Sequence, residues 1–124
     1  MIDYVKFASL PVYDQDRALE FYRDKMGFVV AQDRPYQGEK RWIELSIPEA
    51  RTRIWFADRP DEVPSIQPTL IFITSDLDGV YERLSGMGVH FMQPPSVAPW
   101  SPGERYALAD DSEGNIIMLG EAHG

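Results

Sequence analysis

The stretch YDQDRALEFYRDKMGFVV, residues 13–30, returns in degenerate form as SDLDGVYERLSGMGVHF, residues 75–91. A shift of 62 positions carries Asp14 onto Asp76 and Asp16 onto Asp78, and 62 is half of the 124 residues. An internal period of this kind indicates one structural unit repeated along the chain. The sequence therefore predicts two copies of one module, at about residues 1–60 and about 66–124.

The first half predicts the order strand, helix, strand, strand, strand. Alternating side chains in Tyr4–Val12 indicate a strand, and apolar residues at helical spacing follow it. Asp14 or Asp16 can cap this helix through a side-chain oxygen, and Gly27 can end it in a left-handed conformation. The later strands are expected at Phe28–Ala31, Lys40–Ile47 and Thr52–Ala57.

The second half repeats this order. Thr69–Thr74 is apolar and rich in β-branched residues, and Asp76–Ser85 has apolar residues at helical spacing. Further strands are expected at Val89–Met92, Arg105–Ala109 and Asn115–Leu119.

Two proline-rich segments are expected to lack regular structure. Gln93–Glu104 holds four prolines and predicts a long loop, which carries Trp100. Ala57–Pro68 is polar, rich in proline and without periodicity, so it is expected to link the two repeats within a single domain, residues 1–124.

Composition excludes several classes of function. A chain of 124 residues with 44% hydrophobic residues can bury a core, and its lack of cysteine removes disulfides and thiolate metal sites. The formal net charge of −8 repels nucleic acid and anionic membranes, and either keeps the surface solvated or favours cationic ligands. No segment approaches the roughly 18 apolar residues of a membrane span, and no signal peptide is evident, so a cytoplasmic location is expected.

Three segments in this order resemble the vicinal oxygen chelate superfamily, which includes glyoxalase I, extradiol dioxygenases and bleomycin-resistance proteins. They are SLPVYDQDRALEFYRDKMGF (9–28), FITSDLDGVYERLSGMGV (72–89) and ALADDSEGNIIML (107–119). The resemblance implies an α+β fold in which two tandem βαβββ modules form a curved, cup-like mixed sheet with the helices outside. It also implies a homodimer whose cup holds a small-molecule ligand.

The resemblance also implies where metal ligands would lie. Metal-dependent members of the superfamily place a His, Glu or Gln on each of four strands. The corresponding positions here are Phe7, Trp55, Thr69 and Met118. None of these four is a ligand of the usual kind, so no metal and no cofactor are expected.

Other residues offer few metal ligands or proton acceptors. The two histidines are His90, which is expected to pair with solvent or a carboxylate, and His123, near the C-terminus. Glu44 is expected on a strand that can line the cup, but one carboxylate does not form a chelate. No catalytic residue is therefore assigned, and only Glu44 or His90 is a candidate general base.

Aromatic and apolar residues are expected to line the cup instead. Aromatic faces stack on planar ligands and attract cations. Phe7 and Met118 fit a pocket or a filled core equally well, and Arg105 either meets a ligand carboxylate or phosphate or pairs with Glu104 or Asp110. The candidate ligand-binding residues are Phe7, Trp42, Glu44, Trp55, Thr69, Ile71, Trp100, Arg105 and Met118.

Two functions from different classes follow from the sequence. The first is a metal-free, bleomycin-resistance-like protein that binds a small aromatic or cationic organic molecule in a hydrophobic cleft, with antibiotic sequestration as one role that fits. The alternative is a glyoxalase-like lyase or isomerase, or an extradiol-type dioxygenase, with non-standard metal ligands. A scaffold that only dimerises is a third possibility.

Overall fold

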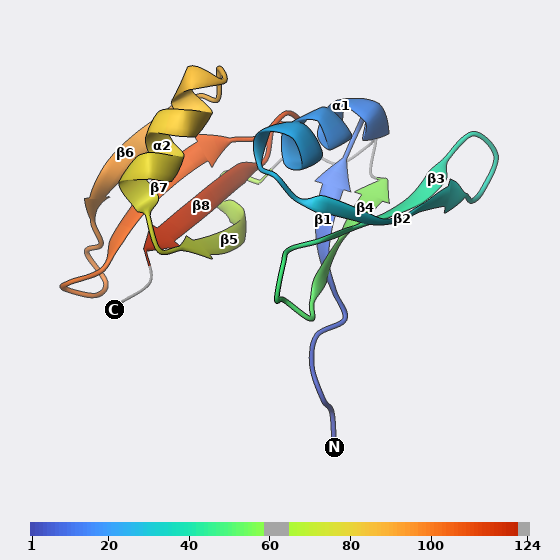
Figure 1. Cartoon of the computed structure of the whole chain (residues 1–124), viewed down its shortest axis with the longest axis horizontal. Helices are drawn as coiled ribbons and strands as arrows, with labels where there is room; N and C mark the ends of the chain where they lie inside the picture. Colours follow the sequence, from blue (N-terminus) through green and yellow to red (C-terminus); the bar gives the residue numbers. More distant parts are fainter. Residues whose placement is uncertain (59–64, 122–124) are drawn as a thin grey trace. The chain divides into compact units, whose positions relative to one another are not determined.

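The computed structural model describes residues 1–58 and 65–121. The chain divides into two compact units, Met1–Glu62 and Val63–Gly124, and each is described by itself. Each unit contains one four-stranded mixed sheet and one helical segment (Figure 1). The expected α+β class and the repeated order βαβββ are therefore confirmed.

In unit 1 the strand order is β1-β4-β3-β2. Strand β1 runs parallel to β4, and the other neighbours are antiparallel. The helix continues from an α-helical turn into a π-helical turn, and Gly27 follows it with a φ of 81°, as predicted. The elements are β1 Phe7–Val12, α1 Gln15–Leu19, η1 Glu20–Lys25, β2 Val29–Pro35, β3 Arg41–Ser46 and β4 Arg53–Asp58.

Unit 2 has the equivalent strand order, β5-β8-β7-β6, again with one parallel pair, β5 and β8. Its elements are β5 Pro68–Thr74, α2 Leu77–Gly86, β6 Phe91–Val97, β7 Arg105–Asp110 and β8 Ile116–Glu121.

The repeat extends to the strand register. Ser9 pairs with Trp55 between β1 and β4, and Ile71 pairs with Met118 between β5 and β8. A shift of 62 residues relates Ser9 to Ile71, and a shift of 63 relates Trp55 to Met118. The two modules therefore place equivalent side chains on equivalent sheet faces.

Each sheet buries one face against its own helical segment. In Figure 1 the α1 coil lies along one side of the sheet of unit 1, and α2 lies across the sheet of unit 2. The side chains buried on the helix-facing side are apolar, as one helix on one sheet face requires. They are Leu10, Val12, Ile43, Leu45, Ile54 and Phe56 with Ala18, Leu19, Phe21 and Tyr22 in unit 1, and Ala107, Ala109, Ile117 and Leu119 with Leu77 and Leu84 in unit 2.

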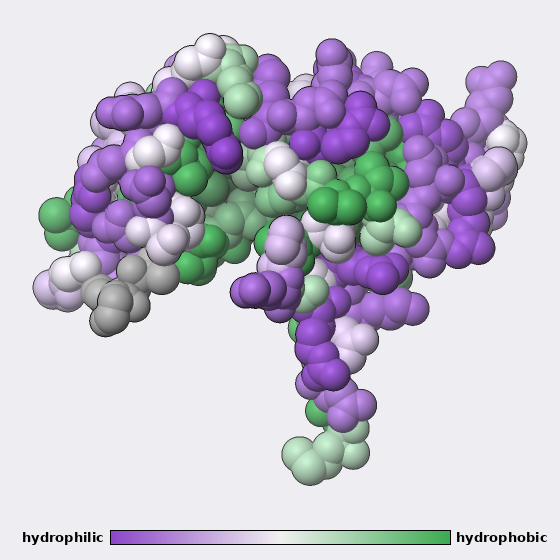
Figure 2. Space-filling model, viewed as in Figure 1, coloured by the Kyte–Doolittle hydropathy of each residue, from purple (hydrophilic) through white to green (hydrophobic). Residues whose placement is uncertain are grey.

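The opposite face of each sheet has no helix of its own unit upon it, and we call it the open face. Because side chains alternate along a strand, the open faces carry the residues between the core positions. Hydrophilic residues cover the outer side of α1 and the β2–β3 hairpin (Figure 2). The polar surface of α1 therefore faces away from the sheet of unit 1.

The predicted loop Gln93–Glu104 is wrong in its first part, and so is the short strand Val89–Met92. Strand β6 extends through Pro94 and Pro95 to Val97. Proline is tolerated here because β6 is the edge strand of its sheet, and its pairing with β7 shifts register between Gln93 and Ser96.

Other expectations differ in extent or lie outside the described residues. The first strand begins at Phe7 rather than Tyr4. Ala57 and Asp58 belong to β4 and Pro68 to β5, whereas residues 59–64 of the expected linker and His123 are outside the described part of the chain. Within residues 1–58 and 65–121, no helix is long and apolar enough to cross a membrane.

The aspartates at the start of the two repeats are predicted to stabilise the helices that follow them in the same way. Asp14 accepts a hydrogen bond from the Arg17 backbone N–H at 3.0 Å, and Asp76 accepts one from Gly79 at 3.0 Å. We expect Asp14→Ala and Asp76→Ala each to lower the free energy of unfolding by about 1 kcal/mol in urea titrations, because each removes one helix N-cap. The Asn variants keep an acceptor oxygen and should lose clearly less; equal losses for Ala and Asn would contradict the capping role.

Candidate functional site

The open face of unit 1 carries a cluster of aromatic rings. Trp42 on β3 and Trp55 on β4 have ring centroids 5.0 Å apart with planes 33° apart. Phe7 on β1 meets the Trp42 ring edge-on at 6.1 Å, and Tyr36 meets it at 5.3 Å. Phe7, Trp42 and Trp55 are half-buried, so the rings form a wall that solvent or a ligand can still reach.

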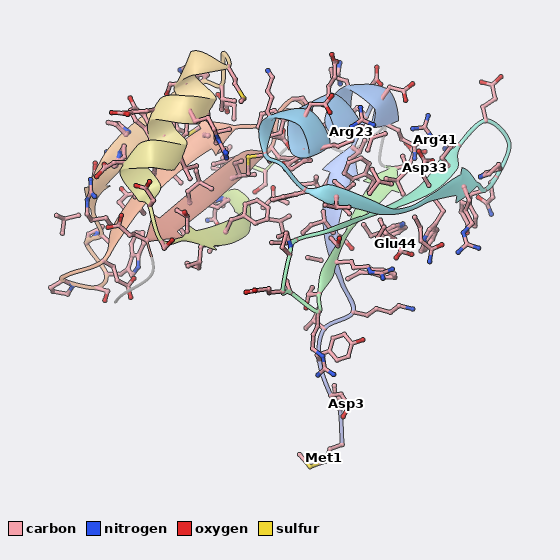
Figure 3. The ribbon with its side chains drawn as sticks, viewed as in Figure 1. Met1, Asp3, Arg23, Asp33, Arg41 and Glu44 are labelled. Carbon is pink, nitrogen blue, oxygen red and sulfur yellow. The ribbon has the colours of Figure 1, made fainter. Side chains whose placement is uncertain are left out.

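Glu44 lies beside these rings and accepts hydrogen bonds from two side chains. Its side chain is nearly inaccessible, with a residue exposure of 4%. Trp42 Nε1 donates to Oε2 at 2.6 Å, and Arg53 Nη1 donates to Oε1 at 2.8 Å. Figure 3 shows Glu44 on the side of the sheet opposite the helical segment that carries Arg23.

These contacts decide the protonation state of Glu44. Burial by itself raises its pKa, but the hydrogen bonds from Trp42 and Arg53, with the Arg53 charge, outweigh burial and lower the pKa from its ordinary value of 4.5. Glu44 is therefore held as an anion with both oxygens engaged. Such a carboxylate is poorly suited to take a proton from a substrate at neutral pH.

A pocket of about 270 Å³ adjoins the aromatic cluster of unit 1. Tyr36, Trp42 and Trp55 form its apolar wall, and Lys40 and Asp58 pair at its rim. Its walls thus combine stacking surfaces with a compensated pair of charges.

The open face of unit 2 is apolar and more exposed. Ile71 is 58% exposed and Trp100 is 57% exposed. The Trp100 ring lies 4.8 Å from that of Tyr106, tilted by 54°. An open pocket of about 620 Å³ lies over this face, lined by Gln67, Pro68, Ile71, Trp100, Tyr106, Leu108 and Met118.

Thr69 lies apart from the other candidate residues of unit 2, whereas Arg105 lines a second pocket, of about 350 Å³, together with Ile71, Trp100 and Met118. Thr69 lies where β5 shifts register against β8, and it lines neither pocket. The Arg105 guanidinium binds both carboxylate oxygens of Asp78, at 3.0 and 2.8 Å, and also approaches Glu121. The hydrogen bonds with Asp78 raise the pKa of Arg105, so this side chain stays charged and is engaged with the first turn of α2. Its partners are therefore not Glu104 or Asp110.

The four positions that would hold a metal do not offer a suitable donor set. Phe7 and Trp55 lie on the open face of unit 1, and Met118 lies on that of unit 2. Phenyl, indole and thioether groups do not supply the oxygen or imidazole donors that catalytic divalent cations need. Among residues 1–58 and 65–121, no three His, Cys, Asp or Glu side chains gather in one place.

His90 pairs with a carboxylate, as predicted. Its Nδ1 lies 2.8 Å from Oδ2 of Asp110, and the side chain is largely exposed. This geometry is that of a hydrogen bond at the surface, and His90 does not line the pockets described above.

Three residues of the open faces were not predicted from the sequence. Leu108 is the register partner of Met118, Tyr106 lies two residues before Leu108 on the same face, and Arg53 is the register partner of Phe7. The sequence could have indicated these positions in two ways. Tyr106 and Leu108 are the repeat equivalents of Trp42 and Glu44, and Arg53 alternates with Ile54 on β4 and so shares a face with Trp55.

The Trp42–Glu44 hydrogen bond gives a pH-dependent prediction. Because the folded pKa of Glu44 is lowered, its ionised form stabilises the fold above the unfolded pKa, and this contribution is lost as the pH falls through the folded pKa. Trp42→Phe removes one donor, so we expect a higher Glu44 pKa in carboxyl ¹³C NMR titrations and a stability loss that is larger at pH 7 than in acid. Trp55→Phe removes no bond to Glu44 and is the control; equal pKa shifts in both variants would refute the assignment.

Comparisons with known proteins agree with this architecture. The protein YurT of Bacillus subtilis (strain 168) is 34% identical over 123 residues, which cover 90% of this chain and 93% of YurT. The crystal structure of a glyoxalase/bleomycin resistance protein/dioxygenase superfamily member from Sphaerobacter thermophilus DSM 20745 is 32% identical, with a TM-score of 0.85 and 98% of both chains covered.

A second solved structure is that of TnmS3, an antibiotic binding protein from Streptomyces sp. CB03234. It is 32% identical to this chain, with a TM-score of 0.84 and 98% of both chains covered. The family model for the Glyoxalase/Bleomycin resistance protein/Dioxygenase superfamily matches residues 2–119. With these matches and two βαβββ modules in equivalent register, the chain belongs to the Glyoxalase/Bleomycin resistance protein/Dioxygenase superfamily.

Proposed function

We propose that this protein binds a small aromatic or cationic organic molecule on its apolar and aromatic open faces, without a metal, and sequesters it as an antibiotic-binding protein does. The observation that carries the proposal is the pocket of about 620 Å³ on the open face of unit 2. Its volume is in the range of small-molecule sites, and apolar and aromatic side chains dominate its lining.

The exposure of these side chains supports a binding role over a core role. Ile71, Ile73 and Trp100 are each more than half exposed. Contiguous exposed apolar groups of this kind mark interaction sites, because a core would have buried them. Trp100 and Tyr106 offer ring faces at an angle to each other, which suits a flat ligand.

The relationship to TnmS3 supports the proposed class of ligand. That protein is an antibiotic binding protein, and it shares 32% identity with this chain over 98% of both chains. The side chains at the four positions of the usual metal ligands support binding over metal-assisted chemistry, because none of the four is a ligand of the usual kind.

We also propose that the protein forms a homodimer, as inferred from the family resemblance. The exposed apolar residues Ile71 and Ile73 of unit 2 are consistent with partial cover by a second copy. Sedimentation equilibrium with and without ligand measures this directly.

Binding can be tested with a planar cationic drug of the bleomycin type. We expect intrinsic tryptophan fluorescence to change on titration, and calorimetry to give an affinity about three- to tenfold weaker for Trp100→Ala, because one aromatic contact is lost. Met87→Ala is the control, since Met87 is an exposed apolar residue at the C-terminal cap of α2 and outside the pocket. Equal affinities for both variants, or no response to any member of a broad library of such compounds, would contradict the proposal.

The absence of a required metal can be tested separately. We expect protein purified without chelators to hold well under one equivalent of Ni, Zn, Mn or Fe by elemental analysis, and to bind its ligand equally well after treatment with a chelator. A stoichiometric metal whose removal abolishes binding would instead favour a metal-dependent enzyme.

A further inference from the structure

The open face of unit 1 has more hydrogen-bond donors than it uses. A guanidinium carries five N–H groups, and Arg53 gives one of them to Glu44. Within the described part of the chain, the others have no protein acceptor, and the Arg53 side chain is 42% exposed. Arg53 is therefore anchored by Glu44 but still presents donors to solvent.

Two neighbours add further donors to the same face. The indole Nε1 of Trp55 has no hydrogen-bond partner among residues 1–58 and 65–121, and Trp55 lies two residues beyond Arg53 on β4. Ser9 is the register partner of Trp55, and its hydroxyl makes no hydrogen bond to a residue within 1–58 or 65–121. The free N–H groups of Arg53 and Trp55 are donors only, and the Ser9 hydroxyl can donate or accept, whereas each oxygen of Glu44, the one carboxylate among these groups, already accepts one hydrogen bond.

The local charge has the opposite sign from that of the whole chain. Arg53 is the register partner of Phe7, and Lys6 lies 5.1 Å from the centroid of the Phe7 ring. Arg34 is the register partner of Trp42. Among residues 1–58, these three cations stand beside one carboxylate, that of Glu44, so the described part of this open face is locally positive although the chain has a net charge of −8.

The repeat shows that the fold does not need this charged pair. Leu108 on β7 pairs with Met118 as Glu44 on β3 pairs with Trp55, and Ile116 precedes Met118 by two residues as Arg53 precedes Trp55. Unit 2 therefore builds the same sheet with Leu and Ile where unit 1 has Glu and Arg. Because unit 2 forms its sheet without these charges, and because an ion pair whose guanidinium is 42% exposed contributes little to stability, the pair in unit 1 is better explained by recognition than by stability.

We infer that the open face of unit 1 binds the oxygen-bearing edge of a planar aromatic molecule, with highest affinity when that oxygen is anionic, as in an aromatic carboxylate or phenolate. Trp42 and Trp55 stack on the ring, Arg53 and Trp55 donate to the oxygen, and Glu44 is a positioning residue that holds Arg53 and the Trp42 indole. This inference rests on the proposed binding function and assigns a ligand class to the face of unit 1.

Three probes with the same ring system test this assignment: 2-naphthoate, 2-naphthamide and 2-naphthylmethylammonium. The indole N–H resonances of Trp42 and Trp55 in ¹⁵N-labelled protein report on unit 1, and that of Trp100 reports on unit 2. We expect Trp42 and Trp55 to shift with naphthoate at an affinity about fivefold or more above that for the ammonium probe, with naphthamide between them, because hydrogen bonds between charged groups are the stronger ones.

Variants taken from the repeat keep the test falsifiable. The double variant Glu44→Leu with Arg53→Ile copies the residues of unit 2, so it is expected to fold and to lose the preference for naphthoate. Arg23→Gln removes one cation from the helical side of unit 1 and is the matched control, expected to keep the preference. An unchanged preference in the double variant, or stronger binding of the ammonium probe to unit 1 of the natural protein, overturns the inference. Failure of all three probes to shift any indole resonance would contradict the proposed function itself.

Discussion

Each module of this protein has one helical segment for one four-stranded sheet, and that ratio governs the rest of the structure. A helix covers one face of a sheet, so apolar residues such as Leu10 and Ile117 are buried there and the alternate residues are left on the open face. The open faces carry Trp42 and Trp55 in unit 1 and Ile71 and Met118 in unit 2. Side chains that would be core if a further layer covered the open face are thereby available to a ligand.

The two open faces have diverged in their side chains more than in their strand order and register. The register pairs Ser9 with Trp55 and Ile71 with Met118 are equivalent in the two modules, and so is the strand order. Unit 1 places a carboxylate and a guanidinium among aromatic rings, whereas unit 2 places aliphatic groups at the same positions. A duplicated fold of this kind provides one scaffold with two chemically different surfaces. The acidic net charge of the whole chain predicts the character of neither surface.

The sequence predicts the fold well because the repeat and the side-chain alternation are local signals. The left-handed Gly27 and a cap at Asp14 or Asp16 could be read from short segments, and Asp14 is the residue that makes the cap hydrogen bond. The path of β6 through Pro94 and Pro95 could not, since proline is allowed there only because tertiary pairing makes β6 an edge strand. The engagement of Arg105 with Asp78, and of Glu44 with Arg53, likewise depends on neighbours distant in sequence, so the residue types were predicted but not their partners.

The central claim is that the ligand lies on the open faces and not within the helix-packed core. Intermolecular nuclear Overhauser effects between a bound planar ligand and assigned methyl groups measure this most directly. The account predicts effects to the Ile71 and Met118 methyl groups of unit 2 and none to Leu77 or Leu119, which are buried on the helix side. Effects confined to the helix-side methyl groups would contradict it.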